Sequence, residues 1–420
     1  MINNKTERVF MVDDDIAMCD FLGQAIKKKG FQFESQNRME GALEYIEKNC
    51  PDLILLDLHL PDGSGIHLTR DIRESSKVAD VPIYMLTTRE FSIEREMAGK
   101  AGVSAFYQKP LDLKTFIAQI EDALSPTIDI KFWGVRGSTP SANQENMEYG
   151  GNTSCMQIVI PDTDEMLIFD SGSGIRNLGN RIFSPQKLIN GRIFITHAHW
   201  DHIQGFPFFK PLYLPQNKFD IYLPAQLSGG AKDVLSGQMN YTYFPVTPDM
   251  LQAKLQYHTL KPRLQNYGDY KIEFMLSNHP VATAIYKIYI NGKVIIYCPD
   301  NELIPEKNDE KNSFRDLLRE YIQDADVVIH DGQYDREGYL SKKHWGHSAW
   351  EEVVEMCAEC GVKNVFLTHH DPDSTDEILE NTKQKLDQYS SQFHSLQLAK
   401  EGGVFKMKMD YDEALAKNGR

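Results

Sequence analysis

Three histidines and one aspartate lie within six residues of the sequence, directly after the apolar run at 192–195, in the stretch His197-Ala198-His199-Trp200-Asp201-His202. Imidazole nitrogen and carboxylate oxygen are ligands for zinc, and also for manganese and iron. Alternate side chains of an extended segment share one side, so we expect His197, His199 and Asp201 to face one way. His202 then lies beside them. Two imidazoles can bind one ion, while Asp201 and His202 are placed for a second.

Candidate ligands recur later in the chain, each near the end of an apolar run. His279 is a third imidazole for the first ion, and His369 completes the second. Asp300 follows the run at 293–297 and can bridge both ions. Polar residues that follow the strands of one sheet meet at its edge. The pattern predicts two divalent ions, with zinc favoured and manganese or iron as alternatives.

Polar residues also follow apolar runs in the N-terminal part of the chain: Asp13, Asp14, Asp15, Asp57, Thr87 and Lys109. Carboxylates that converge at one sheet edge repel one another unless a cation neutralises them. Hard oxygen ligands with room for water suit Mg²⁺. The lysine and the threonine hydroxyl can stabilise a phosphoryl group on one carboxylate, which predicts an aspartyl phosphate.

The elements that must position these N-terminal residues alternate between strand and helix. Short apolar runs at 8–12, 53–56 and 82–86 alternate with amphipathic helical patterns, the last of them at 111–124. Such alternation predicts an α/β domain with a parallel sheet and helices on both faces. Ligands of such a domain lie at the carboxyl ends of its strands.

The pattern changes near residue 128, where longer strands and more frequent glycines begin, so we expect two domains, at 1–125 and 128–410. A composition of 41% hydrophobic and 25% charged residues is that of a soluble globular protein. Neither a signal peptide nor a run of membrane-spanning length is visible, so we expect a cytoplasmic protein with no membrane partner. The formal net charge of −15 opposes binding to polyanions, which argues against DNA and favours small anionic substrates.

The N-terminal motifs, in their order along the chain, resemble the receiver domain of two-component response regulators. The resemblance covers about residues 5–125 and rests on VDDD, LLDLHLPDGSG, MLTT and YQKP. It implies a flavodoxin-like, doubly wound (βα)5 fold and a sensor histidine kinase or phosphotransfer protein as partner. The residue roles that it implies are phosphorylation of Asp57, Mg²⁺ binding by Asp13, Asp14 and Asp57, and switch or phosphate-binding functions for Thr87, Lys109 and Phe106.

The ligand order of the C-terminal part, HxHxDH followed by His, Asp and His, resembles the metallo-β-lactamase fold superfamily of binuclear hydrolases. The resemblance covers about residues 128–408 and implies an αβ/βα sandwich. Asp300 stands where the β-lactamases themselves place cysteine, which argues against that activity. Thioesterases and lactonases share the ligand set, so the ligands alone do not choose the substrate.

A second constellation resembles the phosphodiesterase branch of this superfamily, which includes tRNase Z and cyclic-nucleotide phosphodiesterases. Asp331 follows the apolar run at 326–329, and His347 precedes a helix expected at 349–360. The resemblance implies that His347 donates a proton to the phosphate or to the leaving oxygen. Asp331 would orient it, although the family often has glutamate there. The alternative is that His347 is an ordinary residue at a helix start.

The expected catalytic set is completed by Asp201, which can position or deprotonate the attacking water as well as bind metal. Asp170 is expected to hydrogen-bond a ligand histidine from behind. True tRNase Z usually carries a basic Gly/Pro-rich arm, for which we find no counterpart. Instead an insert within 205–279 is rich in Phe, Tyr and Pro, as in PFFKPLYLP and MNYTYFPVTP. Aromatic rings can stack on a base, although they more often pack in a core.

These observations predict a response regulator whose output is a metal-dependent phosphodiesterase, hydrolysing a cyclic nucleotide under control of Asp57 phosphorylation. One alternative is a tRNase Z-like RNA-processing endonuclease. Another is a signalling adaptor that binds a ligand without catalysis. Control through a homodimer and control through relief of a blocked cleft both stay open.

Overall fold

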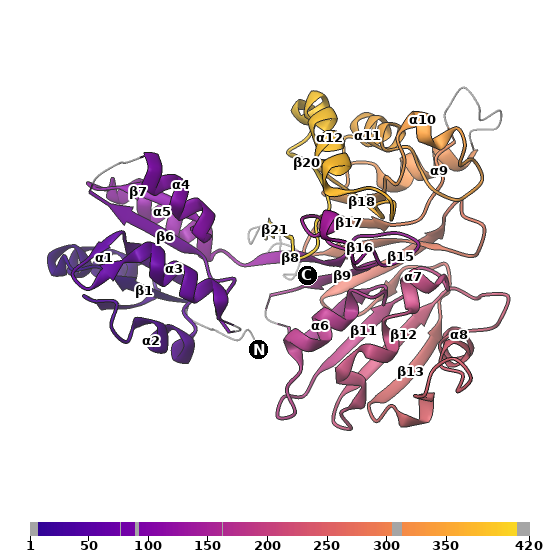
Figure 1. The fold of residues 1–420 in the computed structure, drawn as a ribbon, viewed down its shortest axis with the longest axis horizontal. Coiled ribbons are helices and arrows are strands. Elements are labelled where there is room, and N and C mark those ends of the chain that lie inside the picture. The colour runs from indigo at the N-terminus through magenta and orange to yellow at the C-terminus, as the bar shows by residue number, and fades with distance from the viewer. Residues whose placement is uncertain (1–6, 76, 89–91, 162, 305–312, 410–420) are drawn as a thin grey trace, which may run out of the picture. The chain divides into compact units, whose positions relative to one another are not determined.

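The computed structural model (Figure 1) describes residues 7–75, 77–88, 92–161, 163–304 and 313–409. Within those residues, no helix is long and apolar enough to cross a membrane. The chain divides into two compact units, Met1–Pro126 and Thr127–Arg420. Each unit has its own sheets and its own hydrophobic cores.

The first unit is built on a five-stranded parallel sheet with the order β2-β1-β3-β6-β7. Its sheet strands are β1 (Arg8–Val12), β2 (Gln32–Gln36), β3 (Leu53–Asp57), β6 (Ile83–Thr87) and β7 (Ala105–Gln108). Its helices are α1 (Ile16–Lys28), α2 (Ala42–Asn49), α3 (Gly65–Glu74), α4 (Ser92–Ala101) and α5 (Leu113–Leu124). Successive strand side chains point to opposite faces, so Val9 packs with α1 and α5 while Phe10 packs with α2 and α3. Helices therefore cover both faces, which confirms the predicted doubly wound α/β fold.

The second unit contains two seven-stranded sheets. The first has the order β13-β12-β11-β10-β9-β8-β21 and consists of β8 (Thr127–Gly134), β9 (Cys155–Val159), β10 (Glu165–Phe169), β11 (Asn190–Phe194), β12 (Lys218–Leu223), β13 (Lys254–Thr259) and β21 (Val404–Lys408). The second has the order β14-β15-β16-β17-β18-β19-β20 and consists of β14 (Gln265–Asn266), β15 (Tyr270–Leu276), β16 (Ala284–Ile290), β17 (Lys293–Cys298), β18 (Val327–Asp331), β19 (Asn364–Thr368) and β20 (Ser395–Leu398).

The two sheets of the second unit pack face to face with helices outside. Phe169 and Phe194 of the first sheet meet Tyr286 and Tyr297 of the second in one buried cluster. The outer face of the first sheet is covered by α6 (Ile175–Ile182) and α8 (Ala231–Gln238). The outer face of the second is covered by α9 (Ser313–Ile322), α11 (Trp350–Glu359) and α12 (Asp376–Leu386) (Figure 1). This is the predicted αβ/βα sandwich, and it is confirmed.

The aromatic-rich segment 205–279 differs from the predicted insert, because much of it belongs to the sandwich. It supplies β12 and β13 to the first sheet and α8 to the outer face of that sheet. Two short 3-10 turns completely bury Phe206, which precedes PFFKPLYLP, and Phe209 within it, whereas Phe208 of the same stretch is 49% exposed. In MNYTYFPVTP, by contrast, Tyr241 and Tyr243 are 74% and 83% exposed. The two stretches look alike in composition, but the first buries one of its two phenylalanines, whereas both tyrosines of the second face solvent.

Candidate active site

The candidate ligands of the second unit come from segments that follow its strands. His197 and His199 follow β11, and His279 follows β15. Asp300 follows β17 and His369 follows β19 directly. The inner strands of both sheets end near this point, so their loops meet at one edge of the sandwich. The structure thereby brings together residues that are up to 172 positions apart in the sequence, from His197 to His369.

The expectation that the segment from His197 to Asp201 is extended is wrong. Helix α7 (Trp200–Ile203) begins immediately after His199, whose carbonyl accepts a hydrogen bond from the His202 backbone N–H at 3.0 Å. The helical turn carries Asp201 and His202 away from the side that His199 faces. As a result, the stretch divides its ligands between two groups through a change of backbone conformation rather than through strand alternation.

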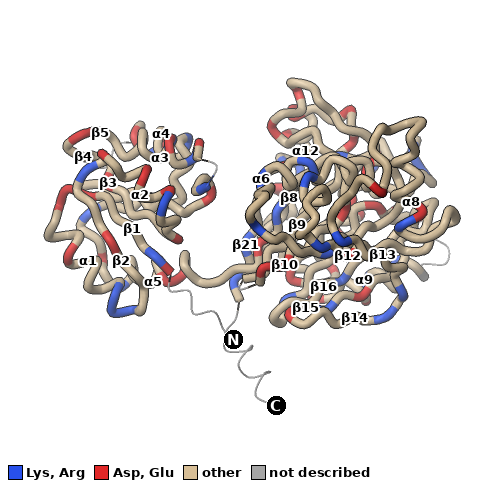
Figure 2. Tube along the Cα trace, turned by 90° about the horizontal axis from the view of Figure 1, so that it is seen from below, with Lys and Arg blue, Asp and Glu red and all other residues tan. Residues whose placement is uncertain are grey.

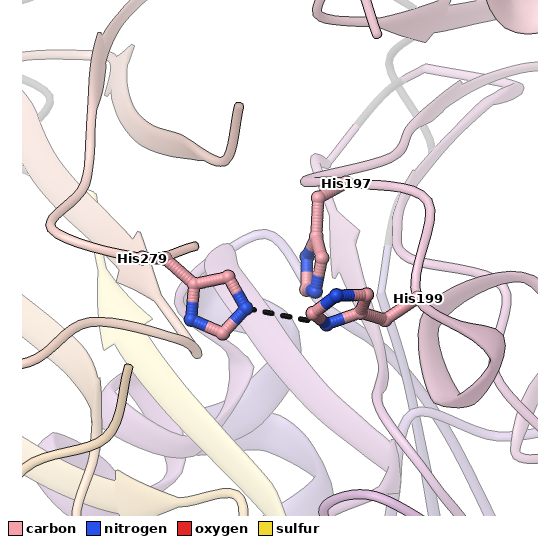
Figure 3. Close-up of side chains that lie close together, drawn as sticks. All are labelled: His197, His199 and His279. Carbon is pink, nitrogen blue, oxygen red and sulfur yellow. Dashed lines mark hydrogen bonds between the residues drawn. The ribbon is translucent and has the colours of Figure 1, made fainter. Parts of the chain in front are cut away.

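The first group consists of His197, His199 and His279, whose side chains point toward one another (Figure 3). One potential ligand atom from each lies within 4.8 Å of those of the others. His279 Nε2 is 3.2 Å from His199 Nδ1. The Nδ1 atom of His279 lies 3.0 Å from the carbonyl oxygen of Gly346, which leaves Nε2 directed at the group. Gly346 has φ +89°, and a Cβ there would lie 2.2 Å from His279 Nδ1, so only glycine fits.

The second group consists of Asp201, His202 and His369. Oδ2 of Asp201 lies 3.1 Å from Nε2 of His369, and Nε2 of His202 lies 3.4 Å from that same nitrogen. Asp300 lies between the groups, with Oδ1 3.0 Å from His202 Nε2 and Oδ2 3.3 Å from His369 Nε2. Its Oδ2 is also 3.8 Å from His197 Nε2 in the first group. This is the arrangement that a bridging carboxylate requires.

The chemistry of this donor set fits two divalent ions. His197 is fully buried, and its Nε2 has no hydrogen-bond partner among the described residues. Burial lowers the pKa of His197 well below its usual range, which keeps the ring in the neutral form that binds metal. Burial opposes ionisation of Asp300, but the neighbouring histidines outweigh it and hold its pKa well below the usual range. Buried carboxylates that stay ionised among nitrogen donors call for positive charge at this place.

Asp170 holds one of the ligand histidines from behind, as expected from the sequence. Its Oδ2 lies 2.8 Å from Nδ1 of His202. Its Oδ1 accepts the Thr196 backbone N–H at 2.7 Å, and Tyr297 donates its hydroxyl to Oδ2 at 3.0 Å. An Nδ1–H donated to a carboxylate leaves Nε2 of the imidazole free to bind metal. Thr196 and Tyr297 were not singled out in the sequence, because their roles depend on contacts across as many as 127 residues.

His347 and Asp331 form a pair beside the ligand groups. Nδ1 of His347 lies 2.7 Å from Oδ2 of Asp331, and both residues are buried. The Asp331 carboxylate is itself fixed, because it accepts the backbone N–H groups of Asn301 and Gln333 at 3.3 and 2.9 Å. The His347 ring stacks on that of His369, with centroids 4.8 Å apart. Helix α11 begins at Trp350, so His347 lies in the loop before the helix and not in its first turn.

The ring of His347 is also close enough to other ligands to join them. Its nitrogens lie within 4.8 Å of ligand atoms of His279 and Asp300, and of Asp331 and His369. Since Nδ1 is engaged by Asp331, a single nitrogen remains for the cavity side. The geometry alone is thus compatible with a metal ligand or with a proton donor.

A loop-ordering carboxylate, Glu302, was missed in the sequence. It is 4% exposed and follows Asp300 by two residues. Oε1 accepts the hydroxyl of Tyr339 and the backbone N–H of His344, both at 2.8 Å, and Oε2 accepts the N–H of Gly346 at 3.1 Å. The same loop carries His347. No local sequence signal marks Glu302, because all its partners lie 37 to 44 residues away.

These groups open into a cavity of 440 Å³, lined by Ser138, Ala198, His199, Trp200, Asp201, His279, Asp300, Trp345, His347 and His369. His197 and His202 are buried behind its wall. The Ser138 backbone N–H donates to Oδ2 of Asp201 at 2.7 Å. Trp200 and Trp345, which the sequence interpretation did not select, stand at the cavity with 78% and 56% of their surface exposed. Imidazole and carboxylate side chains that could hold metal ions thus line one space together with the ring of His347.

The candidate phosphorylation site of the first unit lies at the carboxyl end of its sheet. Asp57 ends β3 and Thr87 ends β6, and both are buried. Nζ of Lys109 lies 2.7 Å from Oδ2 of Asp13 and 2.7 Å from Oδ1 of Asp57. Burial raises the pKa of Asp13, so a cation bound beside this carboxylate would stabilise its ionised form.

The remaining predicted residues of this site differ in their surroundings. Asp14 is exposed, where water can share its coordination of an ion. Asp15 is the N-cap of α1 and accepts the Met18 backbone N–H at 3.0 Å, so the third aspartate of VDDD caps the helix. Phe106 lies half-buried in β7, with the Arg95 guanidinium 5.7 Å from its ring centroid.

Comparison with known families finds two matches in the chain. The response regulator receiver domain matches residues 9–121, and the beta-lactamase superfamily domain matches residues 166–370. Among curated proteins, the phosphate regulon transcriptional regulatory protein PhoB of Escherichia coli is 30% identical over 114 residues, 27% of this chain and 50% of PhoB. The KDP operon transcriptional regulatory protein KdpE of Escherichia coli is 36% identical over 117 residues, 28% of this chain and 50% of KdpE. The chain thus spans about half the length of these relatives.

Solved structures similar to the second unit each cover 67% of this chain. The metallo-beta-lactamase fold protein YhfI of Bacillus subtilis is 18% identical and covered over its full length, with a TM-score of 0.47. A diphosphatase of the PhnP family is 17% identical and 98% covered, with a TM-score of 0.48. The short form of human tRNase Z is 18% identical and 99% covered, with a TM-score of 0.47. The chain thus contains a region that matches the response regulator receiver domain, followed by a region that matches the beta-lactamase superfamily domain.

Proposed function

We propose that this protein is a response regulator whose output is a metal-dependent phosphodiesterase acting on a cyclic nucleotide. The observation that carries the proposal is the His347–Asp331 pair, whose nitrogen and oxygen lie 2.7 Å apart beside the two ligand groups. Hydrolysis of a thioester or lactone would leave such a proton donor without a phosphate to serve. In the proposal, the ligands are His197, His199 and His279 for one ion, Asp201, His202 and His369 for the other, and Asp300 between them.

Two divalent ions bound by these ligands would supply Lewis acidity and a lowered pKa for the attacking water. The side chains supply the rest of the reaction. Asp201 is held by the Ser138 N–H through Oδ2 and lines the cavity, so its carboxylate can orient that water. His347 donates the proton that the departing alkoxide needs, since an unprotonated alkoxide is a poor leaving group. Asp331 accepts the Nδ1–H of His347 and fixes the plane of the ring.

The size and charge of the substrate are inferred from the surroundings of the cavity. The cavity of 440 Å³ accepts a small molecule. Lys and Arg are interspersed with Asp and Glu along both units (Figure 2). Within the described part of segment 205–279, the chain forms strands, helices and turns of the sandwich and no projecting basic arm. With a formal net charge of −15, this supports a small cyclic nucleotide over a long RNA.

The first unit supports regulation by phosphorylation. Lys109 bridges Asp13 and Asp57, and Thr87 ends the adjacent strand, which is the constellation needed to hold a phosphoryl group on Asp57. We propose Asp13, Asp14 and Asp57 as Mg²⁺ ligands, and a sensor histidine kinase or phosphotransfer protein as the partner.

The first test is hydrolysis of a panel of 2′,3′- and 3′,5′-cyclic nucleotides by protein loaded with zinc or manganese. Turnover of one member, lost in His199→Ala, is the expected result. His347→Ala is expected to keep its metal and to lower kcat by about 10²- to 10⁴-fold for an alkoxide leaving group. The loss should be much smaller for bis(4-nitrophenyl) phosphate, because nitrophenolate needs little protonation.

The matched control for that experiment is His394→Ala, which removes a histidine that the structure places outside the cavity. An equal loss on both kinds of substrate in His347→Ala would contradict the role of proton donor and favour a metal ligand. Absence of turnover across the panel, with two ions bound, would overturn the cyclic-nucleotide proposal.

A further inference from the structure

A second cavity, of 710 Å³, adjoins the catalytic cavity and is lined by aromatic side chains. We call it the aromatic cavity and define it by Trp200, Phe208, Tyr243 and Phe244. Ala198 and Trp200 line both cavities. Because they flank the ligand His199 along the chain, a molecule whose phosphate lies at the ligand groups can extend into the aromatic cavity.

The aromatic cavity has an ordered wall and an apolar floor. Phe208 and Phe244 meet edge to face, with ring centroids 5.3 Å apart. Ile203 of α7 and Val234 of α8 lie in the lining and are almost fully buried, with 3% and 8% of their surface exposed. The space is therefore shaped by packed elements and not by a single loop.

The aromatic rings of this cavity remain in contact with solvent. Phe208, Trp200 and Tyr243 are 49%, 78% and 83% exposed. Apolar surface left in water forgoes roughly 25 cal/mol of stabilisation per Å², so a cluster of such rings indicates binding rather than folding. A concave site of several hundred Å³ is typical of small-molecule binding.

We propose that the aromatic cavity binds the nucleobase of the phosphodiester substrate while the phosphate lies at the histidine and aspartate ligands. This inference rests on the proposed function and adds the site that selects the substrate. Aromatic side chains stack on the faces of bases. Ser228, Asp233 and Gln238 supply polar atoms to the lining, and the Asp233 carboxylate can accept an N–H from the base edge. The base and the phosphate are thus recognised in separate, adjoining spaces.

Two substitutions test the aromatic cavity, each with a matched control. Tyr243→Ala removes one wall, while Tyr241→Ala removes a similarly exposed tyrosine of the same loop that lies outside the lining. Gly237→Phe adds a ring where a Cβ meets no atom within 4 Å, at a helical position in the lining. Gly99→Phe makes the same change at an equally open glycine of α4 in the other unit.

The measurement is calorimetric titration of metal-loaded protein with guanosine and adenosine 5′-monophosphate, and separately with inorganic phosphate. We expect Tyr243→Ala and Gly237→Phe to raise the nucleotide Kd by about tenfold. The ratio of nucleotide affinity to phosphate affinity should fall by the same factor, and the two controls should behave as the unaltered protein does.

Nucleotide affinities that are equal in all variants, or nucleotides that bind no better than inorganic phosphate, would overturn the inference. So would tight binding of a single-stranded oligonucleotide that is lost in both variants, if mononucleotides do not bind. Hydrolysis of bis(4-nitrophenyl) phosphate reports on the proposed function separately. Turnover of that compound, together with nucleotide affinities that are the same in all variants, would contradict the base-binding site alone. Nucleotide binding that depends on Tyr243, without turnover of that compound, would contradict the phosphodiesterase activity alone.

Discussion

At the scale of single residues, three candidate ligand histidines each have a partner for the ring nitrogen that points away from the ligand groups. His202 is engaged by Asp170, His279 by the Gly346 carbonyl, and Nδ1 of His369 lies 3.3 Å from Oε1 of Gln333. Each contact fixes the plane of a ring and leaves Nε2 toward the groups. Metal binding by these groups would thus depend on residues that do not bind metal themselves.

Asp170→Asn is expected to weaken metal binding by about 10- to 100-fold. The amide keeps the volume of the carboxylate but has a single acceptor oxygen. In the unaltered protein, four donor atoms share the two oxygens of Asp170. His202 then loses its fixed orientation. Metal content after competition with a chelator measures the effect, and Asp269→Asn, at an exposed position, is the control. Equal metal retention in both variants would show that Asp170 does not act through His202.

Residue types and spacing, together with the family resemblance, selected candidate residues that the structure brings close to one another. The ligands of both groups, with His347, Asp331 and Asp170, were all selected from their types and their places after apolar runs, and the structure brings them together. Glu302, Trp200 and Trp345 were not. A buried carboxylate that accepts three donors 37 to 44 residues away leaves no local pattern, and an exposed tryptophan cannot be told from a core tryptophan by composition.

At the scale of elements, the predicted strands and helices begin and end within a few residues of the expected positions. The conformation of the connections between them was predicted less well. The HxHxDH stretch turns into α7 where an extended segment was predicted. Hydrophobic periodicity cannot resolve one helical turn of four residues. The stretches PFFKPLYLP and MNYTYFPVTP were also interpreted alike, although tertiary packing buries Phe209 of the first and leaves its Phe208 and both tyrosines of the second exposed.

The loop that carries His347 depends on one carboxylate for its conformation, which gives a prediction at this scale. Glu302→Gln keeps an acceptor but replaces the second oxygen with an amide donor facing the N–H of Gly346 or its neighbours. We expect kcat to fall about tenfold or more, because misplacing a proton donor by about 1 Å costs up to 10²-fold. Metal content should stay unchanged, since Glu302 contacts no proposed ligand side chain.

Steady-state kinetics on the cyclic nucleotide that the panel identifies, together with metal analysis, measure this effect. Glu337→Gln, which alters an exposed glutamate of α10 (Arg336–Tyr339), is the control. A rise in KM with unchanged kcat would place the effect of Glu302 on substrate binding instead. Loss of metal in Glu302→Gln would show that the loop supports the ligands through Gly346 and His279.

At the scale of the whole molecule, the proposed function gives the two units complementary parts in signalling. In that proposal, the first unit stores a phosphoryl group and the second hydrolyses a phosphodiester. A phosphoryl group brings a charge of about −1.5 to −2 to a carboxylate that now shares Lys109 with Asp13. That change must rearrange the contacts of Lys109 and offer new acceptors to the Thr87 hydroxyl at the end of β6. Regulation requires that the two arrangements favour different states of the second unit.

Acetyl phosphate with Mg²⁺ is therefore expected to change kcat/KM of the phosphodiesterase by about fivefold or more, the lower range of ordinary coupling between sites. Asp57→Ala should abolish the response and leave basal turnover in place, because the phosphoacceptor lies in the unit that holds no hydrolase ligand. Asp20→Ala, at an exposed position of α1, should respond like the unaltered protein.

Size-exclusion chromatography of the phosphorylated and unphosphorylated protein distinguishes the two routes of control. A response accompanied by dimer formation argues for control through a homodimer, and a response in a protein that stays monomeric argues for relief of a blocked cleft. Unchanged kinetics at full phosphorylation of Asp57 would contradict control of the second unit by phosphorylation of the first.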